Sequence, residues 1–194
     1  LMREIYSLED NIDISDANDN KVDTEITYPW ETSDVTYTKE QLEMRDKWQS
    51  TLMPSGGIVS ARVDSENWLT FGAEDVVPVL YGNYPILMTG GNSTAALRIG
   101  ELIPNEDSET KTINWSQIPS GYDLNVRMSG LVWPEASQRI ANSAYLTREK
   151  IGKGQIILFS GEPNFRGSAR GTNRLWLNAV IYGSGLGTNP LVNP

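Results

Sequence analysis

The sequence predicts an α/β domain, and two observations near its C-terminal end carry this prediction. Four consecutive large apolar residues, Ile156–Phe159, are typical of a strand buried on both faces of a parallel or mixed sheet. A polar loop at residues 161–167 follows, and apolar residues then recur at helical spacing as far as Gly183. Strand, loop and helix in this order build α/β domains, which usually bind ligands beside the loops at the carboxyl ends of their strands.

Local signals place the other elements. Thr38 and Gln41 have the spacing of a capping box, which predicts a helix from Thr38 to about Trp48. Pro134 is expected at the first position of a helix that continues to Ala144, because the missing N–H costs nothing there. The last helix is expected to begin at a cap formed by Thr172 or Asn173. Strands are expected at residues 58–63, 76–81, 84–88, 95–103 and 124–131, and a hairpin is expected between residues 145–150 and 155–160 across a glycine turn.

The chain is expected to hold one domain, residues 56–194, after an extension at residues 1–55. That extension contains an acidic, asparagine-rich stretch, residues 9–25. Counted from Asp16, a calcium loop would need a glycine where Lys21 stands and a glutamate where Thr27 stands. We therefore expect a solvated acidic loop rather than a calcium site. Because the chain starts at Leu1 without a leader, we expect a fragment or a processed form.

Charge and composition exclude several functions. The 194 residues carry a net charge of −9 and a pI near 4.5, which argues against nucleic acid or an anionic membrane as partner. No apolar stretch is long enough to span a bilayer. The sequence has no cysteine and no histidine, so it excludes thiol nucleophiles, Ser-His-Asp devices and thiolate metal sites, and no metal site is expected. A carboxylate pair such as Glu135 and Glu149 leaves glycoside hydrolysis as a remote alternative.

Several blocks of the sequence resemble one group of proteins: residues 68–72, 77–81, 129–130 with 134–135, 152–167 and 170–179. These blocks look like the C-terminal region of bacterial secreted zinc-carboxypeptidase-like proteins, in which a domain similar to class I glutamine amidotransferases follows the peptidase domain. The resemblance covers about residues 56–183 and is densest at residues 152–183.

The resemblance implies a partial three-layer, flavodoxin-like sheet with flanking helices and a β-rich insertion, of which this chain would be the latter part. In the family, histidines and a glutamate of the upstream peptidase domain hold the zinc, and active amidotransferases use a cysteine nucleophile with a histidine. This sequence contains neither cysteine nor histidine, so the resemblance implies that zinc and the catalytic residues belong to the upstream domain. We therefore expect no catalytic residue and no cofactor in this chain. The location that the resemblance implies is periplasmic or secreted, which fits the absence of cysteine.

The loop after Phe159 is the candidate site. Its arginines suit recognition of a carboxylate or of sugar hydroxyls, because the guanidinium donates two parallel hydrogen bonds. The structural alternative is that the loop only locks the fold, with its arginines paired to the acidic body. Trp30 and Trp115, which stand among polar residues, are candidates for exposed contacts. The six candidate ligand-binding residues are Glu162, Asn164, Arg166, Arg170, Asn173 and Arg174.

Two functions follow as expectations. The first is a non-catalytic accessory or interaction domain of a secreted metallocarboxypeptidase-like protein, packed against an upstream peptidase domain or a second copy of the chain. The second is a free-standing module that binds carbohydrate or peptide through the arginine loop and the exposed tryptophans. An isolated half of a doubly wound sheet would expose an edge and apolar faces, so we expect this chain to be packed against a partner.

Overall fold

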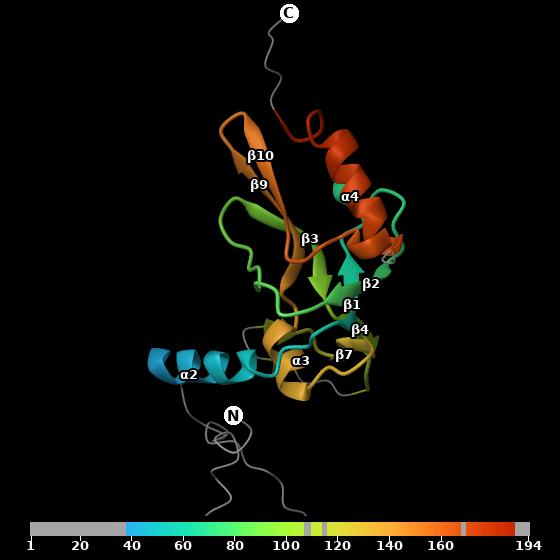
Figure 1. Ribbon diagram of the computed structural model, residues 1–194. Coiled ribbons are helices and arrows are strands. Elements are labelled where there is room, and N and C mark those ends of the chain that lie inside the picture. The colour runs from blue at the N-terminus through green and yellow to red at the C-terminus, as the bar shows by residue number, and fades with distance from the viewer. Residues whose placement is uncertain (1–37, 107–109, 114–115, 168–169, 189–194) are drawn as a thin grey trace, which may run out of the picture. The chain divides into compact units, whose positions relative to one another are not determined.

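The computed structural model describes residues 38–106, 110–113, 116–167 and 170–188 (Figure 1). The described residues all belong to one compact unit, residues 38–194. Three features of the sequence lie outside the described residues: the acidic stretch with its candidate calcium loop, Trp30 and Trp115.

The main sheet is antiparallel at every strand pair, so the predicted flavodoxin-like, three-layer sheet is wrong. Five strands follow the order β10-β9-β3-β1-β2 in a curled half-barrel, and a sixth, β8, pairs with β1. One edge of β1 pairs along its length with β2, and the other edge is shared between β3 and β8. The strands are β1 (Gly57–Val63), β2 (Val76–Tyr81), β3 (Ser93–Ile99), β8 (Arg127–Ser129), β9 (Ala144–Ile151) and β10 (Gly154–Phe159).

Strand β10 explains why the fold class was wrong. It lies at the end of the sheet, and its side chains alternate between the core and solvent. Ile157 and Phe159 pack against the core cluster, whereas Ile156 and Leu158 are 43% and 46% exposed. Four apolar residues in a row therefore do not mark a strand covered on both faces. The predicted hairpin is confirmed, because β10 pairs with β9 across the turn at Gly152.

Two predicted strands are divided in the structure. Gly100, at φ 100°, separates β3 from β4 (Glu101–Pro104), and a Cβ at this glycine would lie 2.6 Å from Cγ of Leu124. The predicted strand at 124–131 is divided between β7 (Tyr122–Asn125), which pairs with β4, and β8. A further two-stranded sheet joins β5 (Lys111–Ile113) to β6 (Ser116–Ile118). The predicted strand at 84–88 is reduced to a single bridge between Leu87 and Ala144.

Helices α2 (Lys39–Ser50) and α3 (Pro134–Ile140) pack against each other. The capping box of Thr38 and Gln41 is confirmed, as is proline at the start of α3. Helix α3 is shorter than predicted, because Ala141 leaves the helical conformation at ψ 129°. Arg139 donates two hydrogen bonds to the Asp46 carboxylate, at 2.9 and 3.1 Å, and this pair ties α3 to α2.

Helix α4 (Arg170–Tyr182) covers the core at the short helix η2 (Trp68–Thr70) and at β2. It begins before the predicted caps, and the Thr172 hydroxyl within it donates to the carbonyl of Pro163. Leu175 is fully buried with core residues of β1, β2, β3 and β9. A Cβ at Gly171 would lie 2.7 Å from Cγ1 of Val77, so this glycine allows close approach of helix and strand.

Candidate functional site

The predicted loop runs from the end of β10 through the turn η3 (Phe165–Gly167) to the start of α4. Glu162 and Asn164 are exposed, and the carbonyl of Asn164 accepts the backbone N–H of Gly167 at 3.0 Å. Arg166 has a positive φ of 49°, and its guanidinium lies over the Phe165 ring, 5.1 Å from the centroid. This stacking fixes the turn but leaves the guanidinium at the surface.

The other three candidate residues lie on α4. Arg170 and Arg174 are exposed and share one face of the helix, and Asn173 is half-buried. Among the described residues, no ion pair or hydrogen bond joins the side chains of the six candidates to one another. The two best cavities of the described residues lie elsewhere, one against α2 and one at β1 and β3. The structure therefore does not gather the six residues around a ligand-sized hollow.

The C-terminal half of α4 has an unusual distribution of side chains. From Leu175 to Tyr182 the helix carries no charged residue and one amide, Asn178, which is buried. The Asn178 amide donates to the carbonyls of Leu69 and Phe71, at 2.9 and 3.0 Å. The outward side is apolar, with Leu177 at 44%, Val180 at 59% and Ile181 at 61% exposure. We call Leu177, Val180 and Ile181 the outer stripe of α4.

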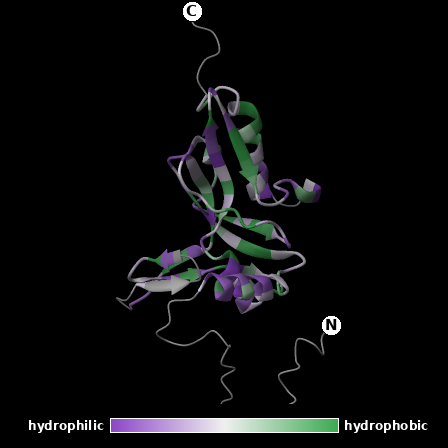
Figure 2. Ribbon diagram, turned by 90° about the vertical axis from the view of Figure 1, so that its left-hand side faces the viewer, coloured by the Kyte–Doolittle hydropathy of each residue, from purple (hydrophilic) through white to green (hydrophobic). Residues whose placement is uncertain are grey.

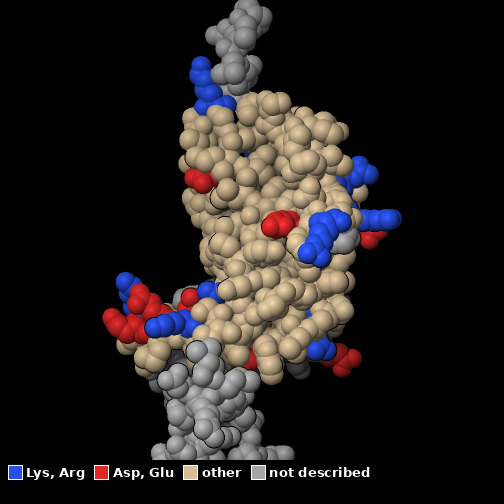
Figure 3. Space-filling model, viewed as in Figure 1, with Lys and Arg blue, Asp and Glu red and all other residues tan. Residues whose placement is uncertain are grey.

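The figures show the same arrangement. The second half of α4 is mostly green in the hydropathy view (Figure 2). In the space-filling view, uncharged tan surface covers this half, and blue side chains gather near the N-terminal end of the helix (Figure 3). Within one helix, the outward surface thus changes from basic to apolar.

The described residues offer little catalytic chemistry. The whole sequence lacks cysteine and histidine, and in the described part of the chain no three carboxylates gather in a way that could hold a metal ion. Glu135 lies in the first turn of α3 and Glu149 lies in β9, so the carboxylate pair considered for glycoside hydrolysis is divided between separate elements. No helix in the described part is long and apolar enough to cross a membrane.

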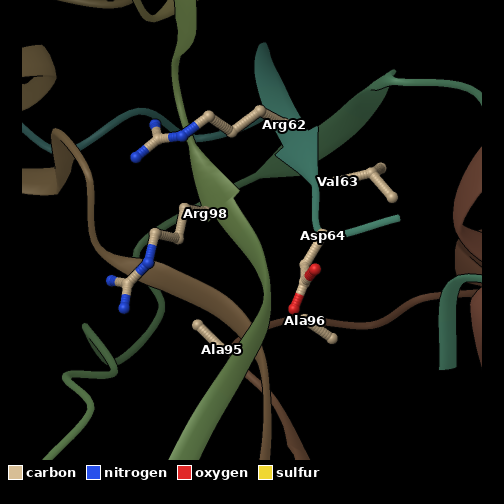
Figure 4. A pocket seen from close by; sticks show the side chains of 6 residues that line it. All are labelled: Arg62, Val63, Asp64, Ala95, Ala96 and Arg98. Atoms are coloured by element: carbon tan, nitrogen blue, oxygen red, sulfur yellow. The ribbon is translucent and has the colours of Figure 1, made fainter. Parts of the chain in front are cut away.

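Sequence reasoning missed two residues that the structure brings together. Arg62 in β1 and Arg98 in β3 are direct cross-strand partners, and both line a cavity of about 250 Å³ (Figure 4). They stand 36 positions apart in the sequence, and each occurs singly in an apolar strand. Only the strand register reveals that they face each other, and no local motif signals it.

No family model, curated protein or solved structure matches this chain.

Proposed function

We propose that this chain is a non-catalytic interaction domain that docks through α4 onto a second copy of itself. The observation that carries the proposal is the apolar outer stripe of a helix whose inner side is already packed on the core. A helix that is apolar all round is normally covered on all sides. The amide of this half, Asn178, faces inward, and the outward side carries no charged residue, so the polar face that a surface helix usually presents to solvent is missing.

The choice of a second copy follows from the distribution of charge along α4. Arg170, Arg174, Leu177 and Ile181 follow one another at helical spacing on one face, whereas the last turn of α4 carries no basic residue. If two α4 helices pack antiparallel about a two-fold axis, the arginines of each copy lie beside the C-terminal carbonyls of the other. Cations are favourable at that end of a helix. The outer stripes then face each other, and a two-fold axis is the commonest symmetry of dimers.

The energetic gain is moderate. Fully burying a valine, leucine or isoleucine side chain contributes about 1.5–3 kcal/mol, so burying the exposed half of each outer-stripe residue contributes about 1 kcal/mol. Ile181→Glu removes this contribution in both copies, about 2 kcal/mol, which corresponds to a roughly 30-fold weaker dimer. The carboxylates brought together at the interface weaken the dimer further.

The test is sedimentation velocity of the purified chain over a wide range of protein concentration. We expect the wild type to dimerise, and Ile181→Glu to have a dimer dissociation constant at least about 30-fold higher with unchanged circular dichroism. Leu131→Glu is the matched control. Leu131 is also an exposed aliphatic residue, at 68% exposure, but it lies just before α3 and not on α4. A wild-type chain that stays monomeric at every concentration refutes the proposal, and so does a control variant that dissociates equally.

Other expectations are independent of the dimer. An upstream zinc peptidase domain and a periplasmic or secreted location rest on the sequence resemblance alone. Glycan or peptide binding by the arginine loop also stays a prediction from the sequence. In the proposed dimer, Arg170 and Arg174 already have a role at the rim of the interface.

A further inference from the structure

Two arginines on neighbouring strands line the cavity at β1 and β3. Arg62 and Arg98 are directly opposite in the antiparallel register. Arg62 alternates with Ala61 in β1, and Ala61 belongs to the core cluster, so the Arg62 side chain leaves the sheet on the other face. Figure 4 shows both guanidinium groups on the same side of β3. Like charges directly opposite each other across two strands are unfavourable, so this arrangement calls for an explanation.

Neutral oxygen atoms hold the two guanidinium groups in place. Arg62 donates to the carbonyl of Gly100 at 3.1 Å and to Oδ1 of Asn142. Arg98 donates to the carbonyl of Asn142 at 3.2 Å and to the Thr89 hydroxyl at 2.8 Å. Asn142 thus binds both arginines, and its own N–H donates to the carbonyl of Ile99 at 2.9 Å. Asn142 has a positive φ of 57°, a conformation that asparagine tolerates better than most residues.

Neither arginine has an acidic partner among the described residues. Asp64 lines the same cavity, but its carboxylate accepts the backbone N–H of Glu66, and Figure 4 shows it on the far side of β3 from the guanidinium groups. Burial lowers the pKa of Arg62, and the neighbouring Arg98 lowers it further. Two half-buried guanidinium groups thus line the hollow without an ion-pair partner in the described part of the chain, and Asp64 contributes one carboxylate to the same lining.

A purely structural role does not need this chemistry. Carbonyl and hydroxyl oxygens can accept from neutral donors, which would not place two like charges at directly opposite strand positions. Each guanidinium has five N–H donors. The protein hydrogen bonds described above use two on each arginine, so donors remain on both groups.

We propose that this cavity binds the phosphate or sulfate group of a small ligand between Arg62 and Arg98. A tetrahedral oxyanion with two negative charges matches two guanidinium groups in charge, and its oxygens match their planar, forked donors. A single carboxylate carries half that charge, so it binds less tightly. The cavity volume of about 250 Å³ accommodates one such group together with part of the molecule that bears it. This site is independent of the α4 docking surface.

The experiment is calorimetric titration of the full chain with inorganic phosphate, sulfate and acetate, followed by a phosphate monoester and a sulfate monoester of one sugar. We expect phosphate or sulfate to bind and acetate to bind at least about tenfold more weakly. A monoester that binds more tightly than its free ion identifies the group as part of a larger ligand, whereas a free ion that binds equally well identifies the ion itself.

Arg98→Gln and its control decide whether the arginines form the site. Glutamine removes both the charge and the forked donors, so we expect affinity for the oxyanion to fall about tenfold or more. Arg127→Gln is the matched control, because Arg127 is an exposed arginine in the adjacent strand β8. Thermal unfolding with and without phosphate provides a second readout, because a bound ligand raises the melting temperature of wild type and control only.

Two results overturn the proposal. One is that neither phosphate nor sulfate binds the wild type. The other is that Arg127→Gln weakens binding as much as Arg98→Gln does, since general electrostatic attraction would then explain it. If Arg98→Gln fails to fold, Arg62→Lys is titrated instead, since lysine keeps the charge but loses the forked geometry, and unchanged affinity in that variant also refutes the site.

Discussion

The attachment of α4 to the body depends on Asn178, and replacing it by leucine tests this. The side chain is 4% exposed and donates to two carbonyls more than a hundred positions earlier, those of Leu69 and Phe71. Leucine has a similar shape but no donor. Losing the bond to the part-buried Phe71 carbonyl costs about 0.5–1.5 kcal/mol, and losing the bond to the buried Leu69 carbonyl, which is left without a donor, costs about 1–3 kcal/mol. We therefore expect Asn178→Leu to lower the free energy of unfolding by about 3 kcal/mol.

Urea unfolding followed by tryptophan fluorescence measures this loss. The midpoint should fall at an unchanged slope, and the melting temperature should fall by roughly 6–12 °C, since each kcal/mol shifts a domain of this size by about 2–4 °C. Asn173→Leu is the matched control, because Asn173 lies on the same helix and no side-chain hydrogen bond of it is found among the described residues. A loss below about 0.5 kcal/mol in Asn178→Leu, or an equal loss in both variants, contradicts the reasoning.

Two further predictions concern the core. Gly171→Ala should lower the free energy of unfolding by about 1–2 kcal/mol despite the better helix propensity of alanine, because the new methyl group meets Val77. In a double-mutant cycle, adding Val77→Ala should recover part of this loss. Burial raises the pKa of Tyr81 to about 12, above the value near 10 of an unfolded chain. The raised pKa of Tyr81 therefore contributes to the free energy of unfolding in full below pH about 10. This contribution, about 3 kcal/mol, is lost as the pH rises to about 12. Between pH about 10 and 12, the free energy of unfolding of Tyr81→Phe should therefore fall less steeply than that of the wild type. An equally steep fall in the variant contradicts this prediction.

Local signals in the sequence predicted local structure well. The capping box of Thr38, the proline at the start of α3 and the glycine turn between β9 and β10 all act within a few residues, and all three are confirmed. These signals depend on backbone geometry and on hydrogen bonds between near neighbours. They therefore need no knowledge of the rest of the fold.

The choice of strand partners was not predictable in the same way. An apolar run such as that of β10 fits both a doubly covered parallel strand and an edge strand, and only tertiary contacts distinguish them. The pair of Arg62 and Arg98 depends on the register between β1 and β3, which no short motif encodes. The arginines predicted from the sequence were recognisable because they are close together in the chain, but the structure leaves them exposed at the surface.

The error in fold class and the proposed docking surface have the same cause. The sequence contains more large apolar residues in β10 and α4 than the core of residues 38–194 uses. In a parallel sheet covered on both faces, that surplus would lie inside the domain, which is why it predicted such a sheet. In the observed antiparallel sheet, Ile156 and Leu158 remain exposed, as does the outer stripe of α4. Single exposed apolar residues are ordinary, but three that adjoin on one helix face, next to exposed arginines, form a surface suited to contact with another protein. The apolar surplus is thus better explained by association than by a second internal layer.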